Sequence, residues 1–382
     1  MTKLTIGLDA KRIVRNGTGL GSYGRTLAND LAAIEGLYLR LYAPDAGRDD
    51  LRLQVPEGPN LHFVYPPSTF LFPPSALWKS YWRSRGIVPQ LKADGVQVFH
   101  GLSGELPIGI RKSGIKTVVT IHDLIFLRHP EYYHWIDVQI YKRKFLQTLR
   151  EADHIVAISE CTRRDISELG GVPEERIVVV YQSCAPRFSS NVSPDTINNV
   201  RARYQLPQHY VLCVGSIEER KNAMLLVGAL PLLPDEVHVV LVGRETSYSK
   251  KIAQRAERIG VGHRLHLLHG VPDEHLPAIY AAAEVFVYPS RYEGFGIPII
   301  EAIRMGLPVV ACSGSCLEEA GGPDNLYVSP DEPMAMAQAI GQLRPGAPDR
   351  EERIGRSRQY IRRFENTDVA WHYFDIYQSL IP

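Results

Sequence analysis

The 382-residue sequence lacks several features that would assign it to a particular class of protein. No apolar run approaches the ~18 residues that a membrane span needs, and the start, MTKLTIGLDA, has no apolar signal-peptide core. The formal net charge is only +1, so no overall field attracts nucleic acid. The five cysteines are odd in number and scattered, and they complete no zinc set. We therefore expect a reduced, cytoplasmic chain that binds neither nucleic acid nor a structural metal.

Several catalytic motifs are also missing. The sequence contains no Walker A run, no HExxH and no G-x-S-x-G. It has no Asp-x-Asp of the kind that holds a divalent ion on a diphosphate. These absences argue against the enzyme classes that depend on each motif.

Short apolar runs that alternate with helix-period stretches fill the chain, a pattern typical of α/β proteins with parallel sheets covered on both faces. The runs predict strands at Leu4–Asp9, Leu37–Ala43, Leu61–Tyr65, Val96–Phe99, Thr117–Ile121, His154–Ile158, Ile177–Tyr181, Tyr210–Gly215, Val237–Val242, Leu265–Leu268, Val285–Tyr288 and Val309–Ala311. Helices are predicted between most of them, including Tyr23–Ile34, Ile136–Glu151 and Pro298–Met305. The Ser- and Pro-rich stretch around 184–197 has no period and predicts a linker. We expect two doubly wound domains, residues 1–187 and 188–364.

The densest group of chemically informative residues is YPSRYEGFGIPIIEAIRMG at 288–306. A predicted strand ends there, glycines at 294 and 296 let the backbone approach a ligand, and Pro298 suits the first turn of a helix. The free N–H groups of a helix start favour phosphate. Glu293 and Glu301, eight residues apart, flank this turn. Two carboxylates around a phosphate-binding turn fit a nucleotide sugar.

Two further groups follow predicted strands. The run GSIEERKN at 215–222 opens with Gly215 and places Arg220 and Lys221 where two cations can neutralise a diphosphate. His122, in Ile121-His122-Asp123, ends a strand of the first half and can contact a transferred sugar. Without family context a structural histidine is the more common outcome.

Residues 19–24 match the dinucleotide pattern G-x-G-x-x-G, with Gly19 and Gly21 as its first two members. That pattern belongs directly after the first strand, and here about eight residues intervene. The spacing favours a flexible glycine loop over an NAD site.

These residues together resemble the retaining glycosyltransferases of family 4. The resemblance rests on EGFGIPIIE at 293–301, GSIEERKN at 215–222, GTGLGSYG near the N-terminus and TIHDLIFLRHPEYY at 120–133. It spans nearly the whole chain and is nearest to bacterial mannosyltransferase-like members that build surface polysaccharides. It implies the GT-B fold: two facing Rossmann-like domains, a deep cleft between them, and a C-terminal helix, 365–382, that returns to the first domain.

The resemblance also implies a role for each matched residue. Glu293 contacts the hydroxyls of the donor sugar, Glu301 those of the ribose, and His122 lies beside the sugar. The diphosphate meets Lys221, Arg220 and the backbone around the remaining residues of the turn, which are Gly294, Phe295, Gly296 and Ile297. Gly19 and Gly21 match a loop that closes over donor or acceptor. The chain departs from the family pattern at Ser216, where many members have Arg, and at Gln182-Ser183, where Asn-Gly is usual.

The resulting hypothesis is a retaining, metal-independent hexosyltransferase without a cofactor. Its donor is a GDP- or UDP-sugar, with GDP-mannose favoured, and its acceptor is a glycan or lipid-linked glycan. Two alternatives stay open: an NAD-dependent oxidoreductase that uses Gly19–Gly24 with Asp45, and a non-catalytic protein that senses nucleotide sugars.

The segment Phe70–Lys92 mixes aromatic and cationic side chains. Such a mixture suits the edge of the cytoplasmic membrane face or a lipid-diphosphate acceptor. A core helix with a basic outer face explains the pattern equally well.

Overall fold

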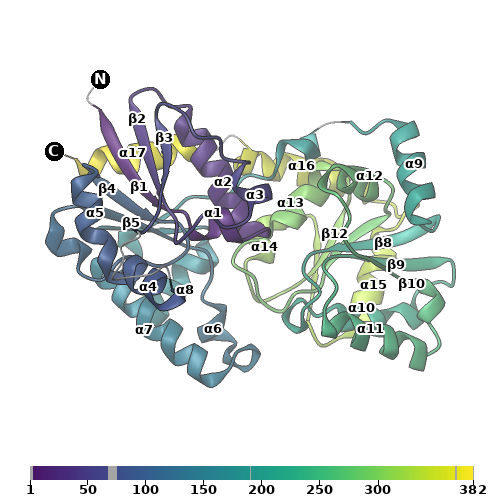
Figure 1. Ribbon diagram of the computed structural model, residues 1–382. Helices are drawn as coiled ribbons and strands as arrows, with labels where there is room; N and C mark the ends of the chain where they lie inside the picture. The colour runs from purple at the N-terminus through teal and green to yellow at the C-terminus, as the bar shows by residue number, and fades with distance from the viewer. Residues whose placement is uncertain (1–2, 68–74, 190, 366–367, 382) are drawn as a thin grey trace. The chain divides into compact units, whose positions relative to one another are not determined.

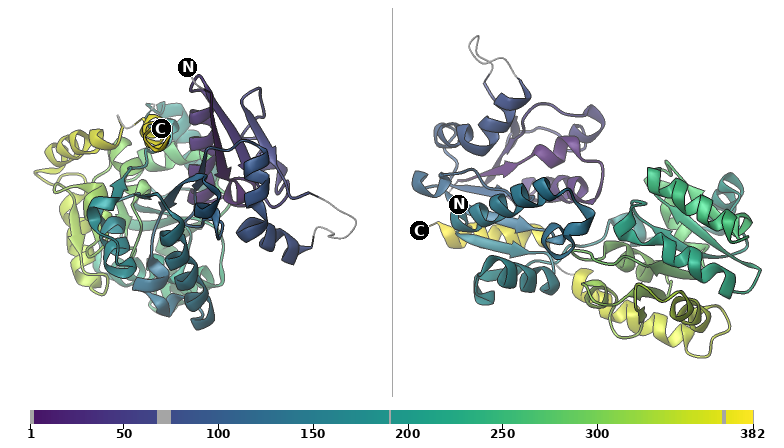
Figure 2. Two further views of the ribbon diagram at one scale, coloured as in Figure 1. Left: turned by 90° about the vertical axis from the view of Figure 1, so that its left-hand side faces the viewer. Right: turned by 90° about the horizontal axis from the view of Figure 1, so that it is seen from below.

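The computed structural model describes residues 3–67, 75–189, 191–365 and 368–381. The chain forms two compact units. Unit 1 comprises Met1–Gln182 and Thr367–Pro382, and unit 2 comprises Ser183–Asn366. In both units helices cover the two faces of a parallel sheet (Figure 1; Figure 2). The sequence placed the boundaries at 187/188 and 364/365, whereas the compact units divide at 182/183 and 366/367.

Unit 1 is built on a seven-stranded parallel sheet of order β3-β2-β1-β4-β5-β6-β7. Its strands are β1 Leu4–Asp9, β2 Leu37–Tyr42, β3 Leu61–Val64, β4 Val98–Gly101, β5 Lys116–Ile121, β6 His154–Ala157 and β7 Ile177–Val179. Its helices are α1 Lys11–Arg15, α2 Gly19–Ala32, α3 Asp49–Arg52, α4 Ala76–Tyr81, α5 Ile87–Ala93, α6 Ile125–Arg128, α7 Trp135–Glu151, α8 Glu160–Gly170 and α17 Val369–Leu380. All six residues of β1 are buried, as expected for a central parallel strand covered on both faces.

Unit 2 has a six-stranded parallel sheet of order β10-β9-β8-β11-β12-β13. Its strands are β8 His209–Val214, β9 Val237–Val242, β10 Leu265–Leu268, β11 Val285–Tyr288, β12 Val309–Cys312 and β13 Leu326–Val328. Its helices are α9 Pro194–Tyr204, α10 Ala223–Ala229, α11 Ser247–Arg258, α12 Leu276–Ala281, α13 Ile297–Arg304, α14 Leu317–Gly321, α15 Pro333–Leu343 and α16 Arg350–Glu365.

Both strand orders confirm the predicted fold class, two doubly wound Rossmann-like domains. In each sheet the order reverses beside the first strand of the unit, between β1 and β4 and between β8 and β11. Ligands of open α/β sheets bind outside the carboxyl ends of strands at such a reversal. The ends of β8 and β11 carry the two residue groups that the sequence singled out in this half.

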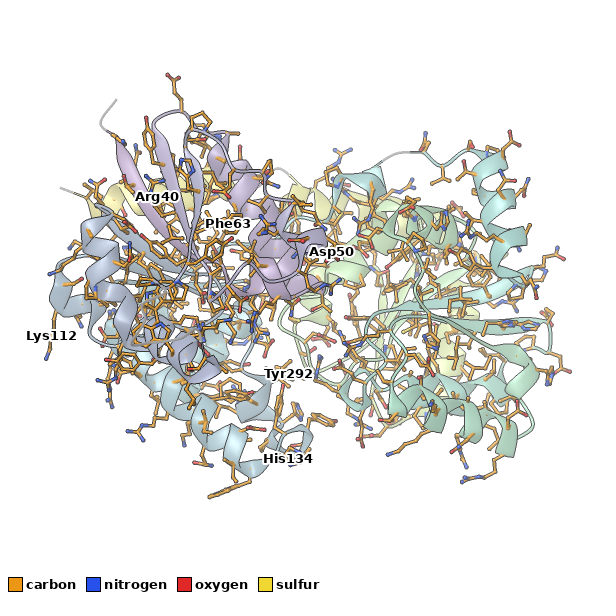
Figure 3. The ribbon with its side chains drawn as sticks, viewed as in Figure 1. Arg40, Asp50, Phe63, Lys112, His134 and Tyr292 are labelled. Atoms are coloured by element: carbon orange, nitrogen blue, oxygen red, sulfur yellow. The ribbon has the colours of Figure 1, made fainter. Side chains whose placement is uncertain are left out.

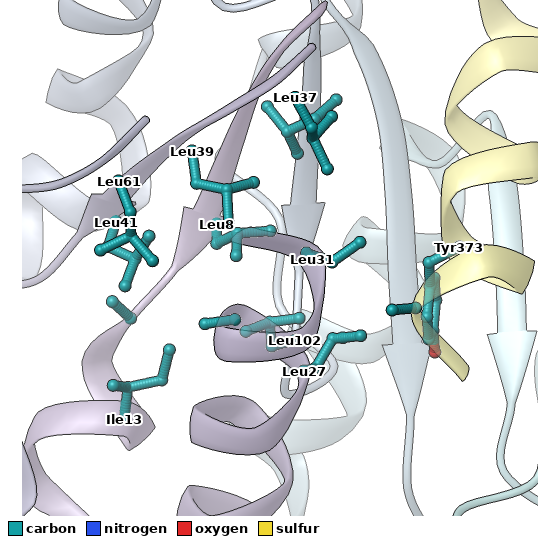
Figure 4. Packing of buried hydrophobic residues seen from close by; sticks show 14 of the residues in the cluster. Leu8, Ile13, Leu27, Leu31, Leu37, Leu39, Leu41, Leu61, Leu102 and Tyr373 are labelled. Atoms are coloured by element: carbon teal, nitrogen blue, oxygen red, sulfur yellow. The ribbon is translucent and has the colours of Figure 1, made fainter. Parts of the chain in front are cut away.

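The C-terminal helix α17 packs on unit 1. Its buried residues Ala370, Tyr373 and Tyr377 join the apolar cluster formed by β1, β2 and α2. Figure 4 shows Tyr373 beside the part of this cluster that contains Leu31 and Leu102. The last helix therefore completes the core of the first unit.

Several local predictions were wrong. The expected linker over 184–197 contains a 3-10 turn, Pro186–Ser189, and the start of α9, which Ser193 caps by accepting a hydrogen bond from the Thr196 amide. Strand β13 was missed because its three residues stand between the turn-forming runs Pro323-Asp324-Asn325 and Ser329-Pro330-Asp331. Helix α16 was missed because it is mostly charged and buries few apolar side chains, among them Ile354, Ile361 and Phe364.

Two general features of the chain complete the description. Among the described helices, none is both long enough and apolar enough to cross a bilayer. All five cysteines are free thiols, and four of them are buried.

Candidate functional site

The carboxyl end of β8 leads into the first part of the site. Gly215 follows the strand, and a 3-10 turn, Glu219–Lys221, carries Arg220 and Lys221 before α10 begins. Gly215, Lys221 and Tyr288 line one small pocket at the ends of β8 and β11. Because β8 and β11 are neighbours in the sheet, residues far apart in sequence meet here.

Glu293 lies at the centre of a compact group of charges. Its carboxylate Oε1 is 2.5 Å from the ammonium of Lys221 and 3.0 Å from the Arg220 guanidinium. The Lys221 ammonium also donates to the Tyr288 hydroxyl, at 2.7 Å, and Arg220 donates to the carbonyl oxygen of Tyr292, at 2.9 Å. The structure thus joins the two predicted residue groups of this unit through direct ion pairs.

Burial determines the charge state of this group. Only 9% of Glu293 is exposed. Burial alone acts to raise the pKa of Glu293, but Lys221 and Arg220 outweigh it and hold the pKa below its ordinary range. Burial also acts to lower the pKa of Lys221, and the charge of Glu293 raises it above the usual value. At neutral pH the site therefore holds two cations and one carboxylate.

The loop between Glu293 and α13 is fixed by close packing. Tyr292, which begins this loop segment, is labelled in Figure 3. The Phe295 ring is buried and meets Phe364 of α16 edge-on at 5.2 Å. The Cys316 thiol donates to the carbonyl oxygens of Glu293, at 3.1 Å, and of Phe295. These contacts hold the loop in one conformation ahead of the helix.

Gly296 is the N-cap of α13 and has a φ of 152°, which favours glycine. A Cβ at this position would lie 3.0 Å from the Cβ of Ala320, so any other residue here would also crowd Ala320. The cap contributes no side-chain hydrogen bond, and Pro298 lies in the first turn. A helix start without a side-chain cap is a place where phosphate can bind, and α13 begins in this way at Ile297. Gly294 lies two residues before the Gly296 cap, in the loop that leads into the helix.

Glu301 lies in a separate environment further along α13. It accepts a hydrogen bond from the Tyr280 hydroxyl of α12, at 3.0 Å. Burial raises the pKa of Glu301 to about 7, while the Tyr280 hydrogen bond acts in the opposite direction. The structure therefore does not pair Glu301 with the cations that hold Glu293.

His122 belongs to unit 1, at the carboxyl end of β5. Its Nε2 lies 2.8 Å from the carbonyl oxygen of Leu102, and its Nδ1 lies 3.1 Å from the side-chain nitrogen of Gln182. The Tyr23 ring meets the imidazole edge-on at 4.8 Å. Burial lowers the pKa of His122 to about 4, so the ring is neutral at physiological pH.

The prediction of a flexible glycine loop around Gly19 and Gly21 is wrong. Both residues lie in the first turn of α2 and are helical. A Cβ on Gly21 would lie 1.8 Å from the carbonyl oxygen of Asn16, so this glycine is required by the close approach of two backbone segments. Helix α1 stands between β1 and α2, where the dinucleotide pattern needs a single turn. Asp45, the acid that an NAD site would need, is ion-paired to Arg15 and Lys79.

Sequence reasoning missed several residues that shape both environments. Tyr280 had no signal beyond its position in an apolar segment, and Tyr288 opened the 288–306 group but was given no role, although each hydroxyl contacts a site residue. Gln182 was visible only as a departure from the usual Asn after β7. Its contact with His122 joins the ends of β5 and β7, which are not neighbours in the sheet.

Comparison with known proteins relates both units to glycosyltransferase families. Residues 17–183 match the family model described as Glycosyltransferase Family 4, and residues 208–344 match the model described as Glycosyl transferases group 1. O-antigen chain mannosyltransferase B of Escherichia coli is 34% identical over 250 residues, which cover 64% of this chain. They also cover 64% of that protein, so the match spans slightly less than two thirds of the relative's length.

Two solved structures share the fold over almost all of the chain. Sucrose-phosphate synthase from Thermosynechococcus elongatus superposes with a TM-score of 0.78 at 21% identity and covers 99% of each chain. Anabaena HepE, solved in complex with UDP-glucose, has a TM-score of 0.75 at 19% identity and covers 98% of this chain and 99% of its own. At these identities the likeness establishes the fold alone. The two family models match the two units in turn, and the chain belongs to the family 4 glycosyltransferases.

Proposed function

We propose that the protein is a retaining glycosyltransferase that moves a hexose from a nucleotide-diphosphate sugar to a glycan or lipid-linked acceptor. Unit 2 holds the donor, and unit 1 contributes His122 and the acceptor site. The observation that carries the proposal is the buried group of Glu293, Lys221 and Arg220 beside the uncapped start of α13. This arrangement combines fixed positive charge with a carboxylate that accepts hydrogen bonds.

The charges suggest how the donor is held. Lys221 has three N–H groups, and contacts with Glu293 and Tyr288 use two of them within the described residues. The third, together with Arg220 and the start of α13, suits the diphosphate. Glu293 is ionised, so it accepts hydrogen bonds from sugar hydroxyls and does not act as an acid. Glu301 lies about one turn into α13 and suits the ribose hydroxyls.

Catalysis then depends on stabilising the departing diphosphate. Negative charge builds up on the leaving phosphate in the transition state, and preorganised cations in a water-poor site stabilise it most effectively. The other carboxylate of this group, Glu218, is 3.9 Å from Arg220 and its side chain is 45% exposed, so it is not a buried partner for Glu293. We therefore favour front-face displacement, in which the leaving phosphate helps to deprotonate the acceptor hydroxyl and the anomeric configuration is retained.

GDP-mannose is the favoured donor, and bacterial surface polysaccharide is the favoured product. The support is the 34% identity to an O-antigen chain mannosyltransferase. UDP-sugars are the competing donors, because a structural neighbour at 19% identity was solved with UDP-glucose.

A panel of nucleotide sugars tests the proposal. Thermal-shift titration identifies the donor that binds, and product analysis by NMR then shows whether its sugar is transferred with retained configuration. Donor binding without turnover on any glycan acceptor would instead support the non-catalytic sensor. A thermal shift with NAD and none with nucleotide sugars would support the oxidoreductase, against which the α1 insertion after β1 already argues.

We also propose that unit 1 touches an anionic membrane surface. Phe70 and Phe72 of the sequence-predicted segment lie outside the described residues, Trp82 is buried, and Arg83 is ion-paired to Asp9 and Glu105. Helix α7 offers a better surface. It exposes the following apolar and cationic side chains: Trp135, Ile136, Ile140, Tyr141, Lys142, Arg143 and Lys144.

Exposed rings and apolar residues next to cations are typical of helices at a membrane interface. Flotation with anionic and neutral liposomes tests this contact. Binding to anionic vesicles that Trp135→Ser with Ile140→Ser abolishes is the expected result, and no flotation at low salt contradicts it.

A further inference from the structure

Both ring nitrogens of His122 are engaged inside unit 1. Nε2 is 2.8 Å from the carbonyl oxygen of Leu102, and Nδ1 is 3.1 Å from the amide nitrogen of the Gln182 side chain. The Tyr23 ring packs edge-on against the imidazole, with an interplanar angle of 82°. The histidine is therefore held from three sides by groups of its own unit.

The partners of His122 define where its proton lies. A carbonyl oxygen only accepts, so Nε2 must carry a hydrogen to bond to Leu102. The side-chain nitrogen of Gln182 only donates, so Nδ1 must present its lone pair. Only the neutral imidazole with its proton on Nε2 satisfies both contacts.

The charged and titratable groups around His122 agree with this protonation state. Arg12 of α1 acts on the ring through its positive charge, and His100 of β4 and Tyr23 of α2 are titratable neighbours. Burial lowers the pKa of His122 to about 4, the Leu102 carbonyl acts to raise it, and Arg12 lowers it further. Burial lowers the pKa of His100 to about 3, so that ring is neutral too.

We propose that Gln182 is a positioning residue that locks His122 as the neutral Nε2–H tautomer. The inference rests on the proposed function, in which His122 lies beside the transferred sugar. Positive charge develops at the anomeric carbon as the diphosphate leaves, so an imidazolium next to it would raise the barrier. A neutral ring with its lone pair already occupied also does not compete for the acceptor proton. Gln182 is the last residue of unit 1 before the chain enters unit 2, and its one hydrogen bond both keeps the ring neutral and engages the Nδ1 lone pair.

The substitution Gln182→Glu tests the proposal because it is nearly isosteric and reverses the hydrogen bond. A carboxylate only accepts, so Nδ1 must take up a proton while Nε2 keeps its own. The new negative charge then favours the imidazolium and raises the pKa of His122 by roughly one to three pH units. As a control, Gln139→Glu places the same charge on the exposed side of α7.

NMR of protein with 15N-labelled histidine reads the protonation of each ring nitrogen, and the His122→Asn variant identifies the His122 signals. In the wild type we expect a protonated Nε2 and an unprotonated Nδ1 from pH 5.5 to pH 8. In Gln182→Glu we expect both nitrogens to be protonated at the acid end of this range. A wild-type Nδ1–H tautomer, or a Gln182→Glu spectrum identical to that of the wild type, overturns the proposal.

Transfer assays provide the second readout. With Gln182→Glu, kcat should fall at least tenfold at pH 5.5 and recover as the pH rises through the new pKa, while the wild type and Gln139→Glu keep a flatter profile. A uniform loss at every pH would indicate a packing role and overturn the assignment. The NMR result does not require turnover, so a failure of the proposed transfer reaction and a failure of the tautomer assignment remain distinguishable.

Discussion

At the scale of single residues, the clearest consequences follow from one carboxylate that forms ion pairs with two buried cations. Glu293 holds Lys221 and Arg220 in place before any ligand arrives, and the two cations keep it ionised. Removing one member of such a group leaves the others buried without compensation. Substitutions here should therefore separate binding of the leaving group from catalysis.

We predict that Glu293→Gln lowers turnover by about 100-fold, which is the effect of losing one preorganised electrostatic contact. Affinity for the nucleoside diphosphate should stay equal or increase, because Lys221 and Arg220 lose their carboxylate and bind phosphate instead. Isothermal titration with GDP and UDP, together with transfer kinetics, measures both effects. The exposed Glu245→Gln of the same unit is the control. Loss of nucleotide affinity in Glu293→Gln would place this carboxylate on the nucleotide and not on the sugar.

Glu301 should give unit 2 a measurable pH dependence. Burial raises the pKa of Glu301 to about 7, above the ordinary carboxyl value of about 4.3. A raised carboxyl pKa means that the folded state binds the proton more tightly, so the stabilisation is complete at low pH. It is lost as the pH rises through 7, by up to about 3 kcal/mol. Glu301→Gln mimics the protonated form and removes this dependence.

Hydrogen exchange of α12 and α13 amides, compared at equal pH, measures the effect. Wild type and Glu301→Gln should be similarly protected at pH 5, and the wild type should be less protected at pH 8. Parallel protection of the two proteins across the range would contradict the raised pKa.

At the scale of elements, a chain of buried hydroxyl and imidazole groups ties the last helix to unit 1. Tyr23 of α2 donates to the Tyr373 hydroxyl of α17 at 2.7 Å, and Tyr373 bonds Thr120 of β5 at 2.6 Å. Thr120 and Tyr377 form hydrogen bonds with the two ring nitrogens of His100, at 2.8 and 2.6 Å. Polar groups in such a network are costly to leave unpaired. Because Tyr23 also packs on His122, α17 supports the candidate site indirectly.

We predict that Tyr373→Phe destabilises unit 1 by about 1–3 kcal/mol, because the Tyr23 hydroxyl loses its acceptor and Thr120 keeps only its hydrogen bond to His100. All four tryptophans (Trp78, Trp82, Trp135 and Trp371) lie in unit 1, so urea unfolding followed by tryptophan fluorescence reports on this unit. Tyr38→Phe is a matched control, since Tyr38 is only partly buried. Equal stability of the two variants would show that the chain of hydroxyls contributes nothing.

At the scale of the whole molecule, the sequence was sufficient for the two doubly wound sheets. Nearly continuous apolar strands such as β1 and β9 can only be buried on both faces, and their alternation with helices requires parallel pairing. The sequence also indicated that Glu293 and Lys221 follow strands. It did not contain the strand order β9-β8-β11 that brings them to 2.5 Å.

Contacts that depend on three-dimensional packing could not be predicted. Gln182 reaches His122 across the end of β6, and no local pattern encodes such a contact. The glycine pattern at 19–24 misled for a related reason: Gly21 is required by its approach to the Asn16 backbone, which only the fold shows. The order of the chain was enough to place the site residues at the carboxyl ends of strands. The groups that these residues contact depend on the packing of the fold.

The expectation that transfer needs no divalent metal concerns the whole proposed donor site and depends on how its carboxylates are used. A departing nucleoside diphosphate carries negative charge that some cation must offset. Mg²⁺ and Mn²⁺ need hard oxygen ligands, usually with a carboxylate among them. In the part of the chain that the structure describes, Glu293 already faces two cations and Glu301 is bonded to Tyr280. A divalent ion at Glu293 would stand next to Lys221 and Arg220 and be repelled by both.

We therefore predict that transfer proceeds at an unchanged rate in excess EDTA, and that Lys221→Ala lowers turnover by about 100-fold or more. Because Lys221 stays charged across the physiological range, its contribution should not vary with pH between 6 and 9. Lys250→Ala, which removes an exposed lysine of the same unit, should have no effect. Transfer assays with and without EDTA on all three proteins measure these outcomes. If chelation abolishes wild-type activity and added Mg²⁺ restores it, the leaving group is stabilised by a metal, and Lys221 and Arg220 have been assigned the wrong role.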